Sequence, residues 1–600
     1  MTASLSLVEC LYQESSLADH CRKRFCCSRV LIFDNSQAAV PRGLDDASRI
    51  LDDKPRLGGQ LWRVERRLHN GRDAPSYKEK TTDNVNDLTQ VESCKVGETI
   101  ATHAGTNRRI KSRHAQMIAI GGSIGTGLFV GSGQALAMGG PGFLLVAYCL
   151  TSLLVYGVVT AVIEVGAYLP VEGASMAYYC GRYVSKSLGF ALGWLYFYSF
   201  GINAYEITAA SIVINYWPND VPVAVWITIM LVIIVALNLS PVAIYAETEF
   251  WFAGIKVIML IGLLILSIVL MLGGGPNHDR IEFTSFLYVW VFAGFSFYFG
   301  PELMIFMTGE MYNPRKNLPT AARRFFYRLI FFYVLGAIAI GAICNSNAKS
   351  LTSGQGNANA SPWVIAIQNA GISVLPSVVN AGILTSAWSA GNSYLFMSSR
   401  ALFSLAVAGD APRIFARCTK YGLPIYAVAA SSCFCLLAYL NVSSQAGEVF
   451  NWFISLTNTA GYTSWAVCCV IFLRFRKGCQ AQGVEVAYSS RFQPYAAWIC
   501  LPTFVFLLLC NGFTVFYPGR FTASSFLTTY LGIPVFLLLW IGHKLLFNRK
   551  EKWMYAPTEL DLHTGLREVE DSEEMQVNEE IDNGGKPGNK AIKAVKAIWE

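Results

Sequence analysis

Apolar runs of roughly 20 residues recur along the chain from about residue 115 to residue 547, with short polar segments between them. A helix of about 20 apolar residues spans the hydrocarbon core of a bilayer. The pattern therefore predicts an all-α polytopic membrane protein with about 12 transmembrane helices. We expect these spans at residues 115–137, 142–167, 188–215, 222–239, 249–272, 285–308, 326–344, 373–407, 423–440, 449–473, 496–516 and 525–547.

Both ends of the chain lie outside these spans and are polar. Residues 1–113 show no regular apolar pattern and no apolar core of a cleavable signal peptide, so we expect a disordered tail. Residues 548–600 carry an acidic run from Glu568 to Asp582, which favours a second solvated and disordered tail. The chain thus divides into an N-terminal tail (1–113), a transmembrane core (114–547) and a C-terminal tail (548–600).

The basic residues between the spans predict which side of the membrane each loop faces, because Lys and Arg accumulate in cytoplasmic loops. A basic cluster from Arg108 to Arg113 ends the N-terminal tail directly before the first span. Alternate loops after it carry Arg182, Lys186, Arg315, Lys316, Arg323, Arg324, Arg328, Arg413, Arg417, Lys420, Arg474, Arg476, Lys477 and Arg491. The loops of the opposite side carry only Arg280, Lys349 and Arg520. We therefore expect both termini in the cytosol.

The first span, His114–Ala137, is interrupted by glycines at 121, 122, 125, 127, 131 and 133. Each glycine inside a helix costs about 1 kcal/mol relative to alanine. Unpaired backbone at membrane depth persists only where it faces protein or a wet cavity. We therefore interpret Gly121–Gly127 as a break in the helix whose free N–H and C=O groups bind a polar ligand. The alternative is that the glycines merely allow close helix packing.

The sixth span repeats this design. Gly300 and Pro301 interrupt the aromatic-rich run from Ala293 to Leu303, and Glu302 follows at once. Proline removes a backbone donor and clashes with the preceding turn. Two discontinuous helices at corresponding positions of two halves are typical of a transporter binding site near the bilayer midplane. Close helix packing is again the alternative.

Three ionisable residues inside or beside these spans are candidates for function, because such residues are costly in a membrane and usually functional. Glu206 lies midway along the third span, and Lys256 lies inside the fifth. A buried ammonium can carry a proton or replace a coupling cation. Glu302 directly follows the break in the sixth span.

Two other acidic residues have simpler interpretations. Glu164 lies near the cytosolic end of the second span, where a local pair or cap is as compatible with the sequence as a function. Glu310 follows the sixth span, and we expect it to form a salt bridge to Arg315 or Arg323.

The eighth span carries a polar stripe. Thr385, Ser389, Asn392 and Ser393 fall at helical spacing on one broad face, with Ser386 beside them. The stripe could line a cavity, or its side chains could form ordinary hydrogen bonds between helices.

Composition excludes several other classes of protein. Only 14% of the residues are charged, far below a soluble chain, and the net charge of +7 is carried mostly by loops, so nucleic acid is not an expected partner. The 16 cysteines show no spacing of a metal site or disulfide framework. No phosphate-binding loop, nucleophile motif or metal-spaced His pair is present, so we expect no enzyme activity, cofactor or metal.

Several stretches resemble the fungal amino acid permeases of the amino acid–polyamine–organocation superfamily. They are GGSIGTGLFVGSG (121–133), EITAASIVINYW (206–217), EFWFAGIKVI (249–258), GEMYNPRKNLPTAARR (309–324) and LTSAWSAGNSYLFMSSRALFSLA (384–406). The resemblance implies a five-plus-five inverted-repeat fold with two added spans and broken helices 1 and 6. It also implies proton-coupled uptake of L-amino acids by alternating access at the fungal plasma membrane.

The resemblance further implies roles for individual residues. The substrate carboxylate would lie on the first-span backbone, and its amino group on the sixth span. Together with the eighth span, this gives a substrate-binding set of Gly121, Gly122, Ser123, Ile124, Gly125, Thr126, Gly127, Ser296, Phe297, Gly300, Ser389 and Asn392. The proton-coupling set is Lys256, Glu206 and Glu302. The expected partners are an amino acid, protons and the lipid bilayer.

Two alternatives remain open at this point. One is a permease or exchanger for amines such as polyamines or choline. The other is an amino acid sensor with little or no transport, for which the long N-terminal tail would provide the signalling segment.

Overall fold

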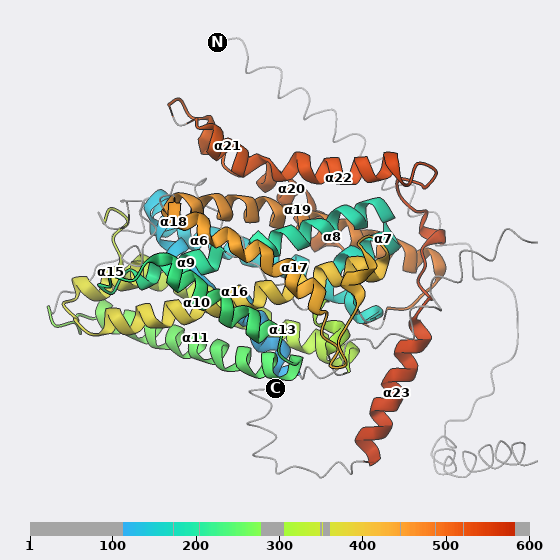
Figure 1. The fold of residues 1–600 in the computed structure, drawn as a ribbon, viewed down its shortest axis with the longest axis horizontal. Helices are drawn as coiled ribbons and strands as arrows, with labels where there is room; N and C mark the ends of the chain where they lie inside the picture. The colour runs from blue at the N-terminus through green and yellow to red at the C-terminus, as the bar shows by residue number, and fades with distance from the viewer. Residues whose placement is uncertain are drawn as a thin grey trace, which may run out of the picture. The chain divides into compact units, whose positions relative to one another are not determined.

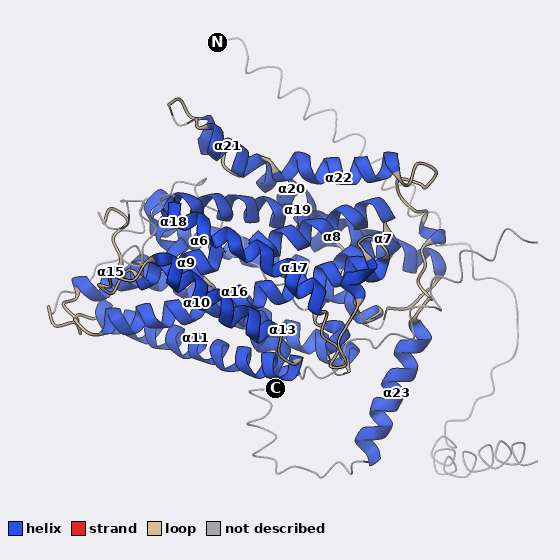
Figure 2. Ribbon diagram, in the orientation of Figure 1, coloured by secondary structure: helices blue, strands red, loops and turns tan. Residues whose placement is uncertain are grey.

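The computed structural model describes residues 112–171, 173–202, 205–277, 305–311, 313–348, 351, 361–443, 446–486, 488–519 and 521–582. Over these residues the chain is helical and contains no β-strand (Figure 1 and Figure 2). The chain divides into two units, and every described residue belongs to the second, Val91–Glu600. The all-α fold expected from the apolar pattern is confirmed.

The helices of the first half are α5 (Ser112–Ser123), the π-helix η1 (Gly127–Gly131), α6 (Ser132–Tyr168), α7 (Met176–Tyr183), α8 (Lys186–Ile202), α9 (Tyr205–Ile214), α10 (Val223–Asn238) and α11 (Val242–Met271). The middle of the chain forms η3 (Thr308–Glu310), α13 (Pro314–Ile343), α15 (Pro362–Asn369), α16 (Leu375–Ala408), η5 (Arg413–Ala416), α17 (Ile425–Cys435), η6 (Leu436–Tyr439), α18 (Leu440–Ser443) and α19 (Ala446–Gln482). The last helices are α20 (Tyr495–Cys510), η7 (Phe513–Phe516), α21 (Ala523–Tyr530), α22 (Gly532–Leu546), η8 (Pro557–Glu559) and α23 (Leu566–Asp582).

Several of these helices are long and apolar enough to cross a membrane. Among the described residues, 4 segments meet that criterion: Gly127–Tyr168, Val242–Met271, Pro314–Ile343 and Asn451–Gln482. The pair α21 and α22, bent by 43°, raises the number to 5 if it forms one span. The protein is therefore a polytopic membrane protein. The sixth predicted span (285–308) falls mostly outside the described residues, so its break stays a prediction.

Local chemistry explains where two of the helices turn or end. Inside α6, Gly140 has φ 75° and Pro141 follows it, which separates the first predicted span from the second. Proline cannot donate to the preceding turn, and glycine tolerates a positive φ. Helix α16 ends at Ala408 because Gly409 adopts a left-handed conformation with φ 86°.

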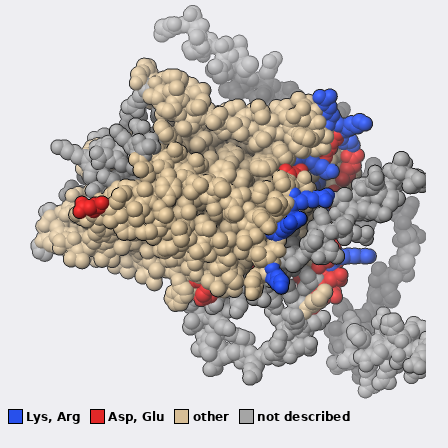
Figure 3. All heavy atoms as spheres, in the orientation of Figure 1, with Lys and Arg blue, Asp and Glu red and all other residues tan. Residues whose placement is uncertain are grey.

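The surface is apolar where it would meet lipid. Figure 3 shows a face with few charges, while Lys and Arg gather at the end where α7 and the C-terminal end of α22 lie. Large apolar side chains are exposed elsewhere, such as Trp251 at 66%, Ile258 at 72% and Leu538 at 72%. In water such a surface would promote aggregation, whereas hydrocarbon accommodates it.

The segment after the last span differs from the solvated tail that the acidic run suggested. Residues 549–582 include η8 and α23, and Leu560, Leu562 and Val569 are at most 3% exposed. The Tyr168 hydroxyl donates to the Leu562 carbonyl oxygen at 3.1 Å, and Arg182 bonds two backbone carbonyls of the segment. The expectation of disorder is therefore wrong for this part, because a few apolar residues anchor an otherwise polar stretch.

Helix α11 places the most important charged residues of the core. Its buried positions include Glu249, Ala253, Lys256, Leu260 and Leu263, which recur every three or four residues. This spacing puts them on one face of the helix, and the remaining positions are partly or fully exposed. Glu249 and Lys256 lie seven residues apart on this buried face and have no exposed surface.

Candidate functional site

The structure breaks the first span at the glycine-rich segment. Helix α5 ends at Ser123, Ile124 and Gly125 form a bend, and the wider π-helix η1 begins at Gly127. Short π-helical segments occur often at functional sites. Of the seven residues from Gly121 to Gly127, all of which the structure describes, only Gly127 is exposed. A ligand can therefore reach the backbone of the break at Gly127.

Side chains from three helices hold the carbonyl groups that the break releases. The Gly121 carbonyl oxygen accepts from Lys256 Nζ at 2.6 Å, and the Gly122 oxygen accepts from the Tyr394 hydroxyl at 3.0 Å. The next two carbonyls, of Ser123 and Ile124, accept from Tyr333 at 2.7 Å and from Ser386 at 3.0 Å. Since a buried unpaired carbonyl is costly, these four donors make the broken geometry a stable part of the fold.

Glu206 lies at the other end of the break. It is 1% exposed on α9, and its Oε2 accepts from the Thr126 hydroxyl at 3.0 Å and from the Thr126 N–H at 3.3 Å. Thr126 is the residue directly before η1, so this carboxylate caps the positive end of the helix. The resemblance assigned such a position to the substrate carboxylate, and here a side chain of the protein occupies it.

Close packing explains one of the glycines. A Cβ on Gly125 would lie 2.4 Å from Glu206 Oε1 and 3.3 Å from the Ala390 Cβ. Glycine is thus required at this position for the approach of the carboxylate. At Gly127, in contrast, no atom of the described residues lies within 4 Å of the Cβ position.

Glu249 is a site residue that the sequence analysis did not single out. Its Oε2 accepts from the hydroxyls of Ser389 at 2.8 Å and Ser393 at 3.2 Å, and its Oε1 accepts from Asn392 Nδ2 at 2.5 Å. Oε2 also lies 3.0 Å from the position of a Cβ on Gly121. The available signal was the spacing of seven residues to Lys256, which is two helical turns. The apolar pattern places Glu249 at the first position of the fifth span, where a charged residue can reach the polar interface and does not indicate a buried site.

The polar stripe of the eighth span is divided between two environments. Ser389, Asn392 and Ser393 donate to Glu249, so both predicted substrate-binding residues of α16 bond to another side chain of the protein. Thr385 instead lines an apolar cavity of about 730 Å³ between α11 and α16 and donates to the Gly382 carbonyl oxygen. The lining of that cavity offers no counter-charge to a zwitterion. The other predicted substrate residues, Ser296, Phe297 and Gly300, and the predicted coupling residue Glu302 lie outside the described residues.

Two further buried acidic residues of the described core, Glu310 and Glu164, form structural ion pairs. Glu310 pairs with Arg400 at 3.3 Å, and both side chains are at most 4% exposed. The expected partner of Glu310, Arg315 or Arg323, was therefore wrong, and Arg315 pairs with Glu573 at 3.3 Å. Arg400 lies ninety positions along the chain from Glu310, so local spacing gave no sign of the pair.

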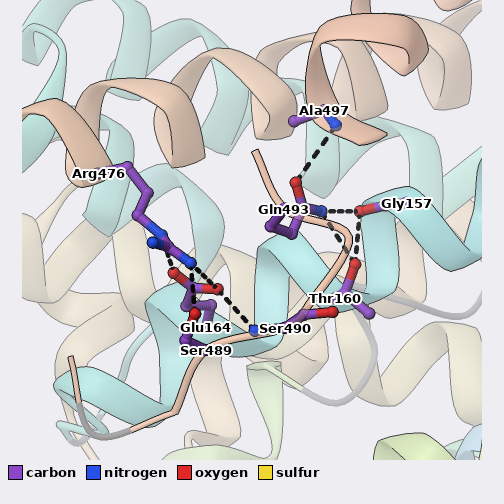
Figure 4. Close-up of polar contacts among 8 residues, drawn as sticks. All are labelled: Gly157, Thr160, Glu164, Arg476, Ser489, Ser490, Gln493 and Ala497. Carbon is purple, nitrogen blue, oxygen red and sulfur yellow. Dashed lines mark hydrogen bonds and ion pairs between the residues drawn. The ribbon is translucent and has the colours of Figure 1, made fainter. Parts of the chain in front are cut away.

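Glu164 joins α6, α19 and the segment that precedes α20 (Figure 4). Its carboxylate on α6 accepts from both Arg476 Nε and Nη2 of α19, and from the Ser490 N–H at 3.3 Å. Gln493 lies beside it and donates to the Gly157 carbonyl oxygen at 2.8 Å and to the Thr160 hydroxyl at 2.9 Å. Glu164 therefore takes part in an ion pair between two helices, and its partner lies 312 positions along the chain.

Known proteins are similar to this chain over most of its length. The family model "Amino acid permease" matches residues 114–555. A proline-specific permease of Emericella nidulans is 43% identical over 499 residues, which are 78% of this chain and 90% of the relative. A proline-specific permease of Saccharomyces cerevisiae is 42% identical, over 78% of this chain and 80% of the relative. A dicarboxylic amino acid permease of the same yeast is 40% identical, over 78% and 81% of the two chains. Among solved structures, a manganese transporter of Eremococcus coleocola aligns over 72% of this chain and 92% of its own, with 13% identity and a TM-score of 0.46.

Proposed function

Because the chain belongs to the amino acid permease family, we propose that it drives the uptake of L-amino acids with protons, by alternating access across the plasma membrane. Its family makes it a membrane transporter of amino acids and not an enzyme. The proton coupling, the membrane and the cytosolic position of both termini are the parts that we propose. Two of the three relatives named above are proline-specific permeases, so L-proline is the first substrate to test.

The observation that carries the proposal is the hydrogen bond from Lys256 Nζ to the Gly121 carbonyl oxygen at 2.6 Å. It joins a fully buried titratable group to the backbone of the break. A hydrogen bond from a charged donor contributes about 1.5–3 kcal/mol, against about 0.5–1.5 kcal/mol for a neutral one. Protonation of Lys256 therefore changes the stability of this break geometry by roughly 1–2 kcal/mol, which is about 5- to 30-fold in population. Such a difference is enough to favour one state of a carrier over another.

The substrate would bind where the backbone is open. Gly127 is exposed, and the N-terminal end of η1 favours a negative group. We propose that the substrate carboxylate binds there, in place of or beside the Glu206 carboxylate. The amino group would then lie toward the sixth span, at Ser296, Phe297 and Gly300, with Glu302 near the coupling path.

Transport into proteoliposomes of the purified protein tests this function. Labelled L-proline should accumulate when the outside is acidic, and the accumulation should disappear when a protonophore collapses the gradient. Competition by each of the twenty amino acids would then define the substrate range. Uptake that is independent of the gradient for every amino acid would contradict the proposal. Uptake that requires preloaded amino acid on the other side would instead indicate an exchanger.

The same preparation tests the alternatives with a binding assay. An amino acid sensor would bind its ligand and show no accumulation under any gradient. Uptake of choline or a polyamine that amino acids do not inhibit would indicate an amine permease.

A further inference from the structure

We propose that Glu249 is a positioning residue for coupled transport: its fixed carboxylate is the counter-charge that keeps Lys256 protonated and bonded to the broken first span. This inference rests on the proposed function. It concerns a residue that does not touch the substrate and acts through Lys256.

The first argument is how firmly the carboxylate is held. Three donors of α16, the side chains of Ser389, Asn392 and Ser393, bond its two oxygens. Asn392 is itself fixed, since its Oδ1 accepts from Asn238 Nδ2 of α10 at 2.7 Å. All of these side chains are at most 2% exposed. A carboxylate with donors on both oxygens is stabilised as an anion at a fixed place.

The second argument is that Glu249 and Lys256 meet at the same residue. Lys256 Nζ bonds the Gly121 carbonyl oxygen, and Glu249 Oε2 lies 3.0 Å from the Cβ position of Gly121. Both side chains have no exposed surface and lie on the same buried face of α11. Opposite charges attract strongly where water is excluded, so a change at one is felt at the other.

Among the residues that the structure describes, the charged and titratable groups around this pair leave Glu249 as the main counter-charge. On α11 itself Tyr245 lies one turn before Glu249, and α16 presents Tyr394 and Arg400. Tyr394 bonds the Gly122 carbonyl oxygen and Arg400 pairs with Glu310. Helix α13 contributes Tyr333, which bonds Ser123, and α5 contributes His114, which pairs with Glu247 at 3.1 Å. The sequence of α10 contains no titratable residue. Glu206 of α9 is directed to Thr126.

The geometry also assigns a different task to Ser389 and Asn392 than substrate binding. They orient Glu249, and Glu249 orients the charge of Lys256. When Lys256 loses its proton during the cycle, the unpaired Glu249 charge favours its return. The pair would thus reset the carrier for the next proton.

The test compares Glu249→Gln with wild type in proteoliposomes, and Glu247→Gln is the matched control. Glu247 lies on the same helix, and its side chain is 47% exposed. Each protein is assayed twice with labelled L-proline, once for accumulation under an inward proton gradient and once for counterflow with equal pH on both sides. A positioning role predicts that Glu249→Gln retains counterflow and loses gradient-driven accumulation by about tenfold or more. The control should behave as wild type in both assays.

The pH profile separates this role from a merely structural one. Without the negative charge of Glu249, Lys256 should lose its proton at a lower pH. The pH above which uptake declines should therefore be about one unit or more lower in Glu249→Gln than in wild type. Glu249→Asp keeps the charge but withdraws it by one methylene, so its profile should lie between those of Glu249→Gln and wild type. An unchanged profile in Glu249→Gln, or accumulation equal to wild type, would overturn the inference.

Failure of the inference and failure of the proposed function are distinguishable. If wild type shows no gradient-driven accumulation, the proposed function is wrong whatever Glu249 does, and the positioning role for coupled transport is overturned with it. If wild type accumulates and Glu249→Gln does too, only the inference is wrong. If Glu249→Gln is not recovered as a folded protein, the double variant Ser389→Ala with Ser393→Ala takes its place in the test. It removes both donors to Glu249 Oε2 and keeps the negative charge of Glu249. That variant should also lose accumulation and keep counterflow, and wild-type behaviour in it would contradict the role.

Discussion

Gly125→Ala is the substitution for which the structure gives the sharpest expectation. The new methyl carbon would lie 2.4 Å from Glu206 Oε1 and 3.1 Å from the Cδ atom of the same carboxylate. Non-bonded atoms come to rest at about 3.5 Å, so the carboxylate must move by roughly 1 Å. The methyl group cannot instead move toward Ala390, because the Ala390 Cβ would already lie 3.3 Å from it.

The size of the effect follows from the contacts that the displaced carboxylate loses. Thr126 donates to Glu206 through its hydroxyl at 3.0 Å and through its N–H at 3.3 and 3.4 Å, and a shift of this size breaks at least the hydroxyl bond. One hydrogen bond to a charged group contributes about 1.5–3 kcal/mol. Overpacking in a filled core adds about 1–3 kcal/mol. We therefore expect a total loss of about 3–5 kcal/mol, or roughly 100-fold or more in the population of the intact site.

The assay is L-proline uptake together with thermal unfolding in detergent. Gly125→Ala should lower both the uptake rate and the unfolding temperature. Gly131→Ala is the control, since no atom of the described part of the chain lies within 4 Å of its Cβ position and its φ is helical. Adding Glu206→Asp to Gly125→Ala withdraws the carboxylate by one methylene and should restore part of the unfolding temperature. Wild-type stability and uptake in Gly125→Ala would refute the packing of Glu206 against the break.

Three further expectations concern the rest of the core. Glu310→Gln leaves the buried Arg400 guanidinium without its carboxylate partner, so the free energy of unfolding should fall by about 3–5 kcal/mol and the unfolding temperature with it. The double variant with Arg400→Met should recover most of this stability. Arg182→Ala removes two hydrogen bonds to backbone carbonyls of the C-terminal segment and an ion pair with Asp561. It should make residues 555–582 more sensitive to limited proteolysis without changing the unfolding temperature of the core, and unchanged cleavage would argue against the docking. Burial raises the pKa of Asp410, in the loop after α16, from 3.8 to about 6, so ionisation of this carboxyl favours the unfolded state. The unfolding temperature of wild type should therefore fall as the pH rises from about 4 to 6. Asp410→Asn should not show this decrease.

Local features of the sequence were sufficient to predict the broken first span. The glycines between Gly121 and Gly127 are costly in a helix and have few other uses in a membrane. The break can therefore be predicted from this segment alone, without knowledge of the residues that contact it. The apolar runs predicted the helical fold for the same reason, because a bilayer imposes helix length on the sequence.

Contacts between distant segments could not be predicted in this way. The donors to the released carbonyls come from α11, α13 and α16, and the partner of Glu310 is Arg400. Glu249 was missed because α11 begins at Val242, seven residues before the expected start of the span. The docking of the C-terminal segment was not predicted, because the segment is polar on average and only a few of its residues, such as Leu562, are buried.

The most direct test of the central claim is the proton movement that accompanies substrate entry. Proteoliposomes with a pH-sensitive dye inside, containing either wild type or Lys256→Met, receive L-proline at equal pH on both sides. Wild type should acidify the lumen as proline enters, whereas Lys256→Met should still bind proline and leave the lumen pH unchanged. Acidification by Lys256→Met at the wild-type rate would contradict the assignment of Lys256 as the coupling residue. Proline entry without acidification in wild type would contradict proton coupling itself.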